Sequence, residues 1–190
     1  MSVTNSTKPS ERSSPEMPAG GSPIRRPAVF FDREGVLNRD VGYLHRPEDF
    51  EWLEGAKTAI RHCNDAGYFV FVVTNQAGVA RGYYDESDVE KLHAWMRAEL
   101  GLQGAHIDAF EYCPHHLDGV RPEYRRACRR RKPEPGMILD LLANWPVDKE
   151  ASFLIGNTQS DLDAAAAAGI AAHLYQGGDL AAFVADRLRT

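Results

Sequence analysis

The stretch FFDREGVLNRD, residues 30–40, decides the fold that this sequence predicts. Two bulky apolar residues run directly into Asp32, and a second acid, Glu34, follows two residues later. Carboxylates are rarely buried unless they are paired or bind a metal ion. The apolar residues 28–31 have the length and composition of a buried strand, so the stretch predicts an acidic functional site at the end of such a strand.

The composition of the chain limits its class. Its 190 residues are 43% hydrophobic and 26% charged, which is typical of one globular domain with a sizeable core. The net charge of −5 gives no support for a nucleic-acid partner, and no apolar stretch approaches the roughly 20 residues that span a membrane. An odd count of three cysteines argues against a disulfide scaffold and favours a reducing, cytoplasmic location.

Residues 1–27 differ from the rest of the chain. They include six Ser and five Pro and almost no large apolar residue, a composition that cannot bury enough surface to fold. They also lack the apolar core of a secretory signal. We therefore predict a disordered tail over residues 1–27 and a single domain over residues 28–190.

Short apolar runs alternate with helical patterns along this domain. Nearly continuous apolar strands separated by helices are typical of a parallel sheet covered on both faces. The fold class is therefore α/β, a Rossmann-like, doubly wound three-layer sandwich with a mostly parallel sheet, and the connections after the first two strands leave no room for a large cap domain. The predicted strands are 28–31, 68–73, 106–112, 152–155 and 171–175, and the predicted helices are 55–66, 85–101, 136–144, 160–168 and 177–189.

Acidic residues follow two of the predicted strands, and ligands in such folds lie beyond the carboxyl ends of the strands. Asp32 can be a nucleophile or a metal ligand, and Glu34 can reach the same space as an acid and base. Asp161 arrives from the loop after the fourth strand. Two carboxylates that converge from different strands suit Mg²⁺.

Other strand-end residues suit a phosphate group. Thr74 and Asn75 offer a hydroxyl, an amide and backbone N–H groups, and Lys132 adds a positive charge. Each feature alone is common in ordinary turns and caps. Their order along the chain, D-x-E-G, then T-N, then K-P, then G-N-x-x-S-D, indicates phosphoryl transfer through an aspartyl-phosphate.

These residues resemble the haloacid dehalogenase (HAD) superfamily of phosphatases, over about residues 28–178. Within it the chain is similar to the small, capless branch that contains D-glycero-D-manno-heptose 1,7-bisphosphate 7-phosphatases and histidinol-phosphate phosphatases. The segments that carry the resemblance are FFDREGVLNRDVGYL, FVVTNQAGVARGYY, YCPHH, CRRRKPEPGM and IGNTQSDLDAA.

The resemblance implies a role for each matching residue. Asp32 takes the position of the nucleophile, Glu34 that of the acid/base, and Thr74 that of a residue that stabilises the phosphoryl group. Arg131 resembles the residue that recognises the sugar bisphosphate, and Lys132 the one that neutralises phosphoryl charge. The implied substrate contacts are Asp40, Val41, Gly42, Tyr43, Thr74, Asn75, Gln76, Ala77, Arg131 and Lys132, and the implied Mg²⁺ ligands are Asp32, Glu34, Asn157 and Asp161.

The sequence departs from the branch at three positions. Its first motif reads D-R-E where the family has D-x-D, and Glu34 is longer than aspartate by roughly 1.5 Å. Asn157 replaces an aspartate on the magnesium loop, so we expect weaker metal binding. The branch often holds a structural zinc with C-x-H and C-x-C, but here Cys113, His115 and Cys128 are followed by Arg130 in the last position, with His116 as a substitute ligand. Zinc is therefore doubtful.

The leading interpretation is a Mg²⁺-dependent, monomeric phosphatase that acts on a small sugar phosphate, most simply D-glycero-D-manno-heptose 1,7-bisphosphate. The departures support an alternative, an impaired relative that binds a phosphorylated ligand or partner without turnover. Histidinol-phosphate phosphatase and polynucleotide 3′-phosphatase are further alternatives. The basic run RRACRRRK, residues 125–132, suggests nucleic acid when taken alone, but in an acidic chain it favours the rim of an anionic-sugar pocket.

Overall fold

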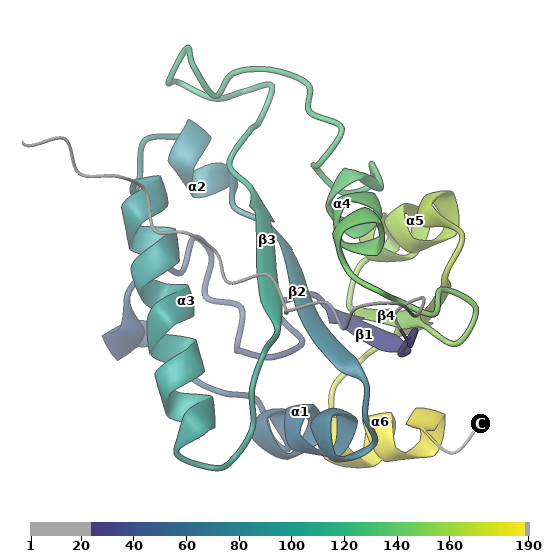
Figure 1. Ribbon diagram of the computed structural model, residues 1–190. Coiled ribbons are helices and arrows are strands. Elements are labelled where there is room, and N and C mark those ends of the chain that lie inside the picture. Colours follow the sequence, from purple (N-terminus) through teal and green to yellow (C-terminus); the bar gives the residue numbers. More distant parts are fainter. Residues whose placement is uncertain (1–23, 189–190) are drawn as a thin grey trace, which may run out of the picture.

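Five parallel strands form the centre of the molecule in a computed structural model that describes residues 24–188 (Figure 1). Their order across the sheet is β3-β2-β1-β4-β5, with all four neighbouring pairs parallel. The strand bounds are Ala28–Phe31 for β1, Phe69–Asn75 for β2, Ala109–Cys113 for β3, Phe153–Gly156 for β4 and Ala171–Leu174 for β5. The predicted α/β class with a parallel sheet is confirmed.

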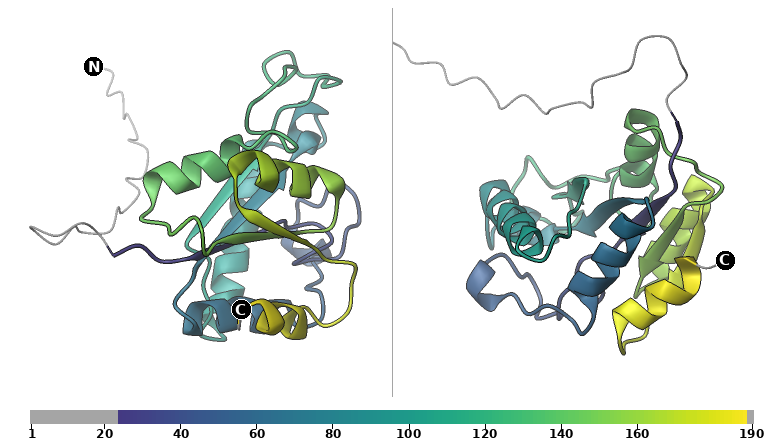
Figure 2. Two further views of the ribbon diagram at one scale, coloured as in Figure 1. Left: turned by 90° about the vertical axis from the view of Figure 1, so that its right-hand side faces the viewer. Right: turned by 60° about the horizontal axis from the view of Figure 1, so that its bottom comes forward.

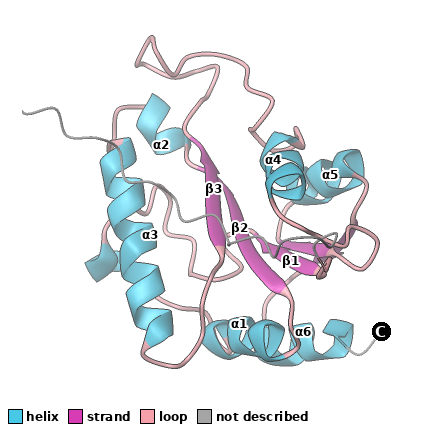
Figure 3. Ribbon diagram, in the orientation of Figure 1, coloured by secondary structure: helices cyan, strands magenta, loops and turns pink. Residues whose placement is uncertain are grey.

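Helices cover both faces of the sheet, because successive side chains of a strand point to opposite faces. Val29 and Phe31 of β1 pack on one face with α1, α3 and α6, whereas Ala28 and Phe30 pack on the other with α4 and α5. Figures 2 and 3 show these three layers, with α1 and α6 side by side. The helices are η1 (Pro47–Asp49), α1 (Ala56–Asp65), α2 (Ala77–Ala80), α3 (Glu86–Gly101), α4 (Gly136–Asn144), α5 (Gln159–Ala168) and α6 (Leu180–Leu188).

The boundaries differ from the sequence prediction at several places. The strand β2 extends to Asn75, so Thr74 and Asn75 lie within the strand and not after it. The strand β3 begins at Ala109, because Asp108 uses its side chain to accept a hydrogen bond from Val70 N–H (2.8 Å). The short helices η1 and α2 were not predicted, since three or four residues carry no periodic apolar signal.

The predicted tail over residues 1–27 falls mainly outside the described residues. Arg25 and Arg26, however, belong to the domain. The guanidinium of Arg25 donates to Val147 O (3.0 Å), and that of Arg26 donates to Gly67 O (2.7 Å) and stacks on the Phe69 ring. Residues shortly before position 28 therefore contact the domain that was predicted to begin there.

The connections place the polar segments at one edge of the sheet. The connection from β1 to α1 contains only the single turn η1, and the one from β3 to α4 is a long loop that rises beyond the strand ends (Figure 1). Neither holds a separate cap domain within residues 24–188. None of the described helices has the length and apolar character required to cross a membrane.

Close packing at the end of β4 gives a first prediction. A Cβ atom added at Gly156 would lie 2.2 Å from Cβ of Asp161, so Gly156→Ala forces β4 and α5 apart. We expect a loss of about 1–3 kcal/mol in the free energy of unfolding, measured by urea denaturation. The control is Gly101→Ala at the end of α3. An added Cβ there would meet no neighbouring atom within 4 Å, so we expect a small gain in the free energy of unfolding. Equal stability of the two variants would contradict the packing argument.

Candidate active site

One cavity of about 160 Å³ lies at the carboxyl edge of the sheet, where β1, β2 and β4 end beside the loop before α4. The topology explains why residues so distant in sequence meet here, since the ends of parallel strands lie at the same edge. The lining residues are Asp32, Glu34, Asp40, Asn75, Lys132, Asn157, Thr158, Ser160 and Asp161.

A buried lysine joins two carboxylates in this cavity. The Nζ atom of Lys132 lies 2.6 Å from Oδ1 of Asp32 and 2.5 Å from Oδ1 of Asp161. Lys132 also donates to Val73 O (2.9 Å), and all three charged residues are buried. Each charge is therefore compensated by a partner, as burial requires.

The pKa values in this group follow from burial and from the pairing. Burial raises the pKa of Asp32 to about 6, with Lys132 opposing the shift and Asp161 adding to it. Burial lowers the pKa of Lys132, but the two carboxylates outweigh it, so that the net shift is upward. At pH 7 Asp32 is therefore mostly ionised beside the ammonium of Lys132.

Asp161 is held in place by the start of α5. Its Oδ2 atom accepts hydrogen bonds from Thr158 Oγ1 (2.7 Å), Thr158 N–H (3.0 Å) and Asn157 N–H (3.2 Å). Thr158 and Asp161 form a capping box at this helix end. Because Oδ2 is occupied, only Oδ1 of Asp161 faces Lys132 and the cavity.

Lys132 is held by Asn75 at the end of β2. The side-chain amide of Asn75 donates to Lys132 O and accepts from Lys132 N–H, both at 3.0 Å. Next to it, Oγ1 of Thr74 accepts from Gln76 (2.9 Å), and Gln76 accepts from the hydroxyl of Tyr84 (2.7 Å). Thr74 is fully buried and does not line the cavity, but its hydroxyl proton remains available to a further acceptor.

The donor set of the cavity fits a magnesium ion. Oδ1 of Asn157 is buried and has no hydrogen-bond partner among the described residues, and Oδ1 of Asp161 meets only the ammonium of Lys132. A buried oxygen without a partner, such as Oδ1 of Asn157, calls for a group that the protein itself does not supply, and a cation is one such group. With the carboxylates of Asp32 and Asp161 it offers two carboxylates and one amide oxygen, and Mg²⁺ needs only one or two carboxylates beside phosphate and water.

Other predicted site residues lie around the cavity. Asp40 lines it, whereas Val41, Gly42 and Tyr43 line a neighbouring hollow of about 410 Å³. Tyr43 packs edge-on against Tyr83 (ring centroids 4.7 Å apart). Arg131 lines a third hollow of about 300 Å³, which shares Lys132 with the cavity. Gln76 and Ala77, at the start of α2, line none of these three hollows.

Known proteins are similar to this chain in sequence and in fold. A HAD-hydrolase-like family model matches residues 129–188. The D-glycero-beta-D-manno-heptose-1,7-bisphosphate 7-phosphatase of Rhodopseudomonas palustris is 52% identical over 160 residues, which cover 84% of this chain and 89% of the relative. The chain belongs to the heptose-1,7-bisphosphate 7-phosphatase family.

Two further members of this heptose bisphosphate phosphatase family extend the comparison. The D-glycero-alpha-D-manno-heptose-1,7-bisphosphate 7-phosphatase of Photorhabdus laumondii is 42% identical over 142 residues, 75% of this chain and 78% of the relative. The D,D-heptose 1,7-bisphosphate phosphatase of B. bronchiseptica, solved with magnesium and phosphate, is 32% identical with a TM-score of 0.77, and the match covers 86% of this chain and 98% of that one. The family resemblance inferred from the sequence is confirmed.

The chain also has a cluster of two cysteines and one histidine at and beyond the end of β3. The donor atoms of Cys113, His115 and Cys128 lie within 4.8 Å of one another. Burial raises the pKa of Cys113 to about 12. His116 is not part of this cluster among the described residues, and its Nδ1 accepts from Asp118 N–H (3.0 Å). Three donors are one fewer than a structural zinc site uses.

Arg130, the residue in the fourth position, is engaged elsewhere. It forms ion pairs with Glu111 and with Asp140, the latter at 3.6 Å. The cavity also contains two residues that the sequence analysis missed, Thr158 and Ser160. The pattern T-x-x-D, residues 158–161, is a capping-box signature that could have located the first of them.

The raised pKa of Asp32 gives a second prediction. An acid with a folded pKa of about 6 and an unfolded value near 3.8 holds its proton longer in the folded state. Stability therefore falls as pH rises from about 4 to about 6, by up to about 3 kcal/mol in metal-free protein. Asp32→Asn should remove this loss and be the more stable protein at pH 7.

Urea unfolding between pH 4 and pH 8, in the presence of a chelator, measures this effect. Asp163→Asn, an exposed change on α5, is the control and should follow the natural protein. Parallel stability curves for the natural protein and Asp32→Asn would show that the buried carboxyl is not the source of the loss.

Proposed function

We propose that this protein is a Mg²⁺-dependent phosphatase that hydrolyses D-glycero-D-manno-heptose 1,7-bisphosphate, or a closely similar sugar phosphate, at one phosphomonoester. The observation that carries the proposal is the buried group of Asp32, Lys132 and Asp161 at the carboxyl edge of the sheet. The names of the relatives support the substrate. Since those names include both the alpha and the beta sugar, they leave the anomer open.

Asp32 is the proposed nucleophile. One of its carboxylate oxygens attacks the phosphorus, an O–P bond forms, and the bond from phosphorus to the sugar oxygen breaks. A pKa of about 6 leaves the carboxylate ionised at neutral pH and more basic than an ordinary aspartate. Lys132 keeps the carboxylate oriented and offsets charge that develops on the transferring group.

Glu34 is the proposed acid and base. Its side chain is 22% exposed and lines the cavity, so it can reach both the leaving group and water. It donates a proton to the departing sugar oxygen, then removes a proton from the water that attacks the aspartyl-phosphate, which releases phosphate and regenerates Asp32. The substrate and one water molecule thus give the free sugar hydroxyl and phosphate, and no other reactant is needed.

Asp32, Asn157 and Asp161 would hold the Mg²⁺ ion, with Glu34 close by. When bound, the ion supplies positive charge that draws the phosphate into the cavity and offsets the net negative charge of the carboxylates. Asn157 contributes an oxygen but no charge, so we expect a lower affinity for Mg²⁺ than an aspartate would give.

The remaining residues are proposed to hold the substrate. Thr74 has a free hydroxyl proton for a phosphate oxygen, and Asp40 is placed to accept from sugar hydroxyls. The adjacent hollows, one with Val41, Gly42 and Tyr43 and one with Arg131, give room for the sugar and for its second phosphate. Asn75 lines the cavity, and Gln76 and Ala77, which follow it in the chain, are part of the proposal through the family resemblance alone. A monomer in the reducing cytoplasm, which suits three free cysteines, is part of the same proposal.

A phosphate-release assay tests the function. Both heptose bisphosphate anomers, histidinol phosphate and a 3′-phosphorylated oligonucleotide are compared, with Mg²⁺ and with chelator. We expect Mg²⁺-dependent release from a heptose bisphosphate, and no release by Asp32→Asn because an amide cannot form the acyl phosphate. Ligand binding without release by the natural protein would favour the alternative, a relative that binds without turnover. Release from another substrate in the panel would change the substrate assignment.

The zinc content is a separate prediction. Protein purified without chelator should carry well under one zinc per chain, because Cys113, His115 and Cys128 provide three ligands where a structural site has four. Arg130→Cys supplies a fourth ligand, the third thiolate, and should raise the content toward one zinc per chain. Elemental analysis of both proteins decides this, and stoichiometric zinc in the natural protein would show that another ligand completes the site.

A further inference from the structure

Arg33 is a fully buried cation directly beside the nucleophile. It has the largest of the fully buried side chains, with 0% exposure. Its Nη2 atom donates to Oε1 of Glu34 and to the carbonyl oxygen of Leu44, both at 2.9 Å. Glu34 is its one carboxylate partner among residues 24–188. A charge at this depth is tolerated only when a counter-charge and hydrogen bonds compensate it, so Arg33 and Glu34 depend on each other.

His93 supports Arg33 from the opposite side. Its Nε2 atom lies 3.4 Å from Nη1 of Arg33. A guanidinium has only donors, so Nε2 of His93 must accept, which requires a neutral ring. Burial and the nearby charge of Arg33 lower the pKa of His93 well below its usual value, which agrees with this state.

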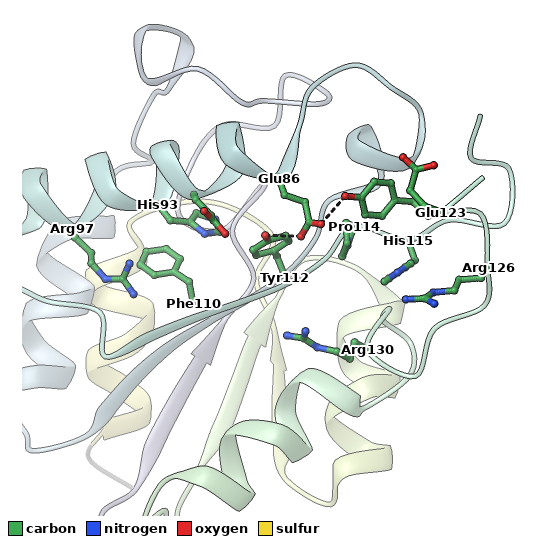
Figure 4. A pocket seen from close by; sticks show the side chains of 12 residues that line it. Glu86, His93, Arg97, Phe110, Tyr112, Pro114, His115, Glu123, Arg126 and Arg130 are labelled. Carbon is green, nitrogen blue, oxygen red and sulfur yellow. Dashed lines mark hydrogen bonds between the residues drawn. The ribbon is translucent and has the colours of Figure 1, made fainter. Parts of the chain in front are cut away.

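The histidine is itself fixed by its surroundings. It comes from α3 and stacks on the ring of Phe110 in β3, with ring centroids 4.3 Å apart. Figure 4 shows both residues at one end of a groove of about 600 Å³ between α3 and β3. The contacts from His93 to Arg33 and from Arg33 to Glu34 therefore connect α3 to the proposed acid and base.

We propose that Arg33, braced by His93, is a positioning residue that holds Glu34 over the leaving group. The proposal rests on the proposed function. A glutamate has one more rotatable bond than the aspartate of the family pattern, and fixing a long side chain costs entropy. The tie to Arg33 supplies the geometry that the shorter acid would have by itself, which explains how a glutamate can serve at this position.

The bond to Leu44 adds a second consequence. Leu44 is buried and follows the exposed residues Asp40–Tyr43, which are proposed to contact the sugar. One guanidinium thus fixes both the acid and the end of the substrate loop. Loss of Arg33 should lower kcat through Glu34 and raise KM through this loop.

The test uses two leaving groups. A sugar phosphate needs a proton on its departing oxygen, whereas p-nitrophenyl phosphate has a leaving group that departs with little assistance. We expect Arg33→Lys, which keeps the charge but loses the planar fork, to lower kcat on the sugar phosphate about a hundredfold and to affect p-nitrophenyl phosphate far less. In a Glu34→Gln background the same change should cause little further loss on the sugar phosphate.

The histidine provides a matched pair if Arg33→Lys folds poorly. His93→Gln keeps an acceptor near the position of Nε2 and should stay within about threefold of the natural protein. His93→Leu removes the acceptor and should lose at least about tenfold in kcat, selectively on the sugar phosphate.

Each remaining outcome counts against the proposal. Equal losses on both substrates, or losses that multiply in the Glu34→Gln background, would show that Arg33 only stabilises the fold. Failure of His93→Gln to keep more activity than His93→Leu would remove the histidine from the proposal. A natural protein that hydrolyses neither substrate would refute the proposed function itself, and the positioning role with it.

Discussion

The ammonium of Lys132 between two carboxylates is the constraint on which the rest of the structure depends. Both carboxylates are buried, and the one ammonium compensates them while it stays within about 3 Å of each. Removing that ammonium would leave two buried carboxylates without a counter-charge, which costs about 3–5 kcal/mol. Since the three residues are 100 and 29 positions apart in sequence, only a rigid framework can keep them together.

The parallel sheet provides that framework, and local hydrogen bonds complete it. Asp32 follows β1 directly, and its N–H donates to Ile155 O of β4 (2.9 Å), which ties the proposed nucleophile to the neighbouring strand. Asn75 then fixes the backbone of Lys132, and Thr158 fixes Asp161. The charges are therefore held by groups that are themselves fixed, so that little reorganisation is required when a phosphate binds.

The sequence predicted the sheet and the meeting of Asp32, Lys132 and Asp161, because apolar runs mark buried strands and parallel strands end at one edge. It also placed Cys113, His115 and Cys128 in one cluster, and their donor atoms do lie within 4.8 Å of one another, while the expectation of little zinc there stays a prediction. It could not predict the burial of Arg33. An arginine between two acids suggests a surface, and the partners that make burial possible, Leu44 and His93, are distant in sequence. Similarly, α2 has no periodic signal of its own.

Two of the three departures from the family pattern, Asn157 and Glu34, act on the same electrostatic balance. Asp161 already raises the pKa of Asp32, and a third carboxylate at position 157 would raise it further. Asn157 keeps an oxygen in place without that charge, so Asp32 stays ionised near neutral pH, at the expense of attraction for a cation. Glu34, in turn, directs its charge to Arg33. In both places negative charge is withdrawn from the centre of the cavity, which leaves Lys132 as the dominant partner of the nucleophile.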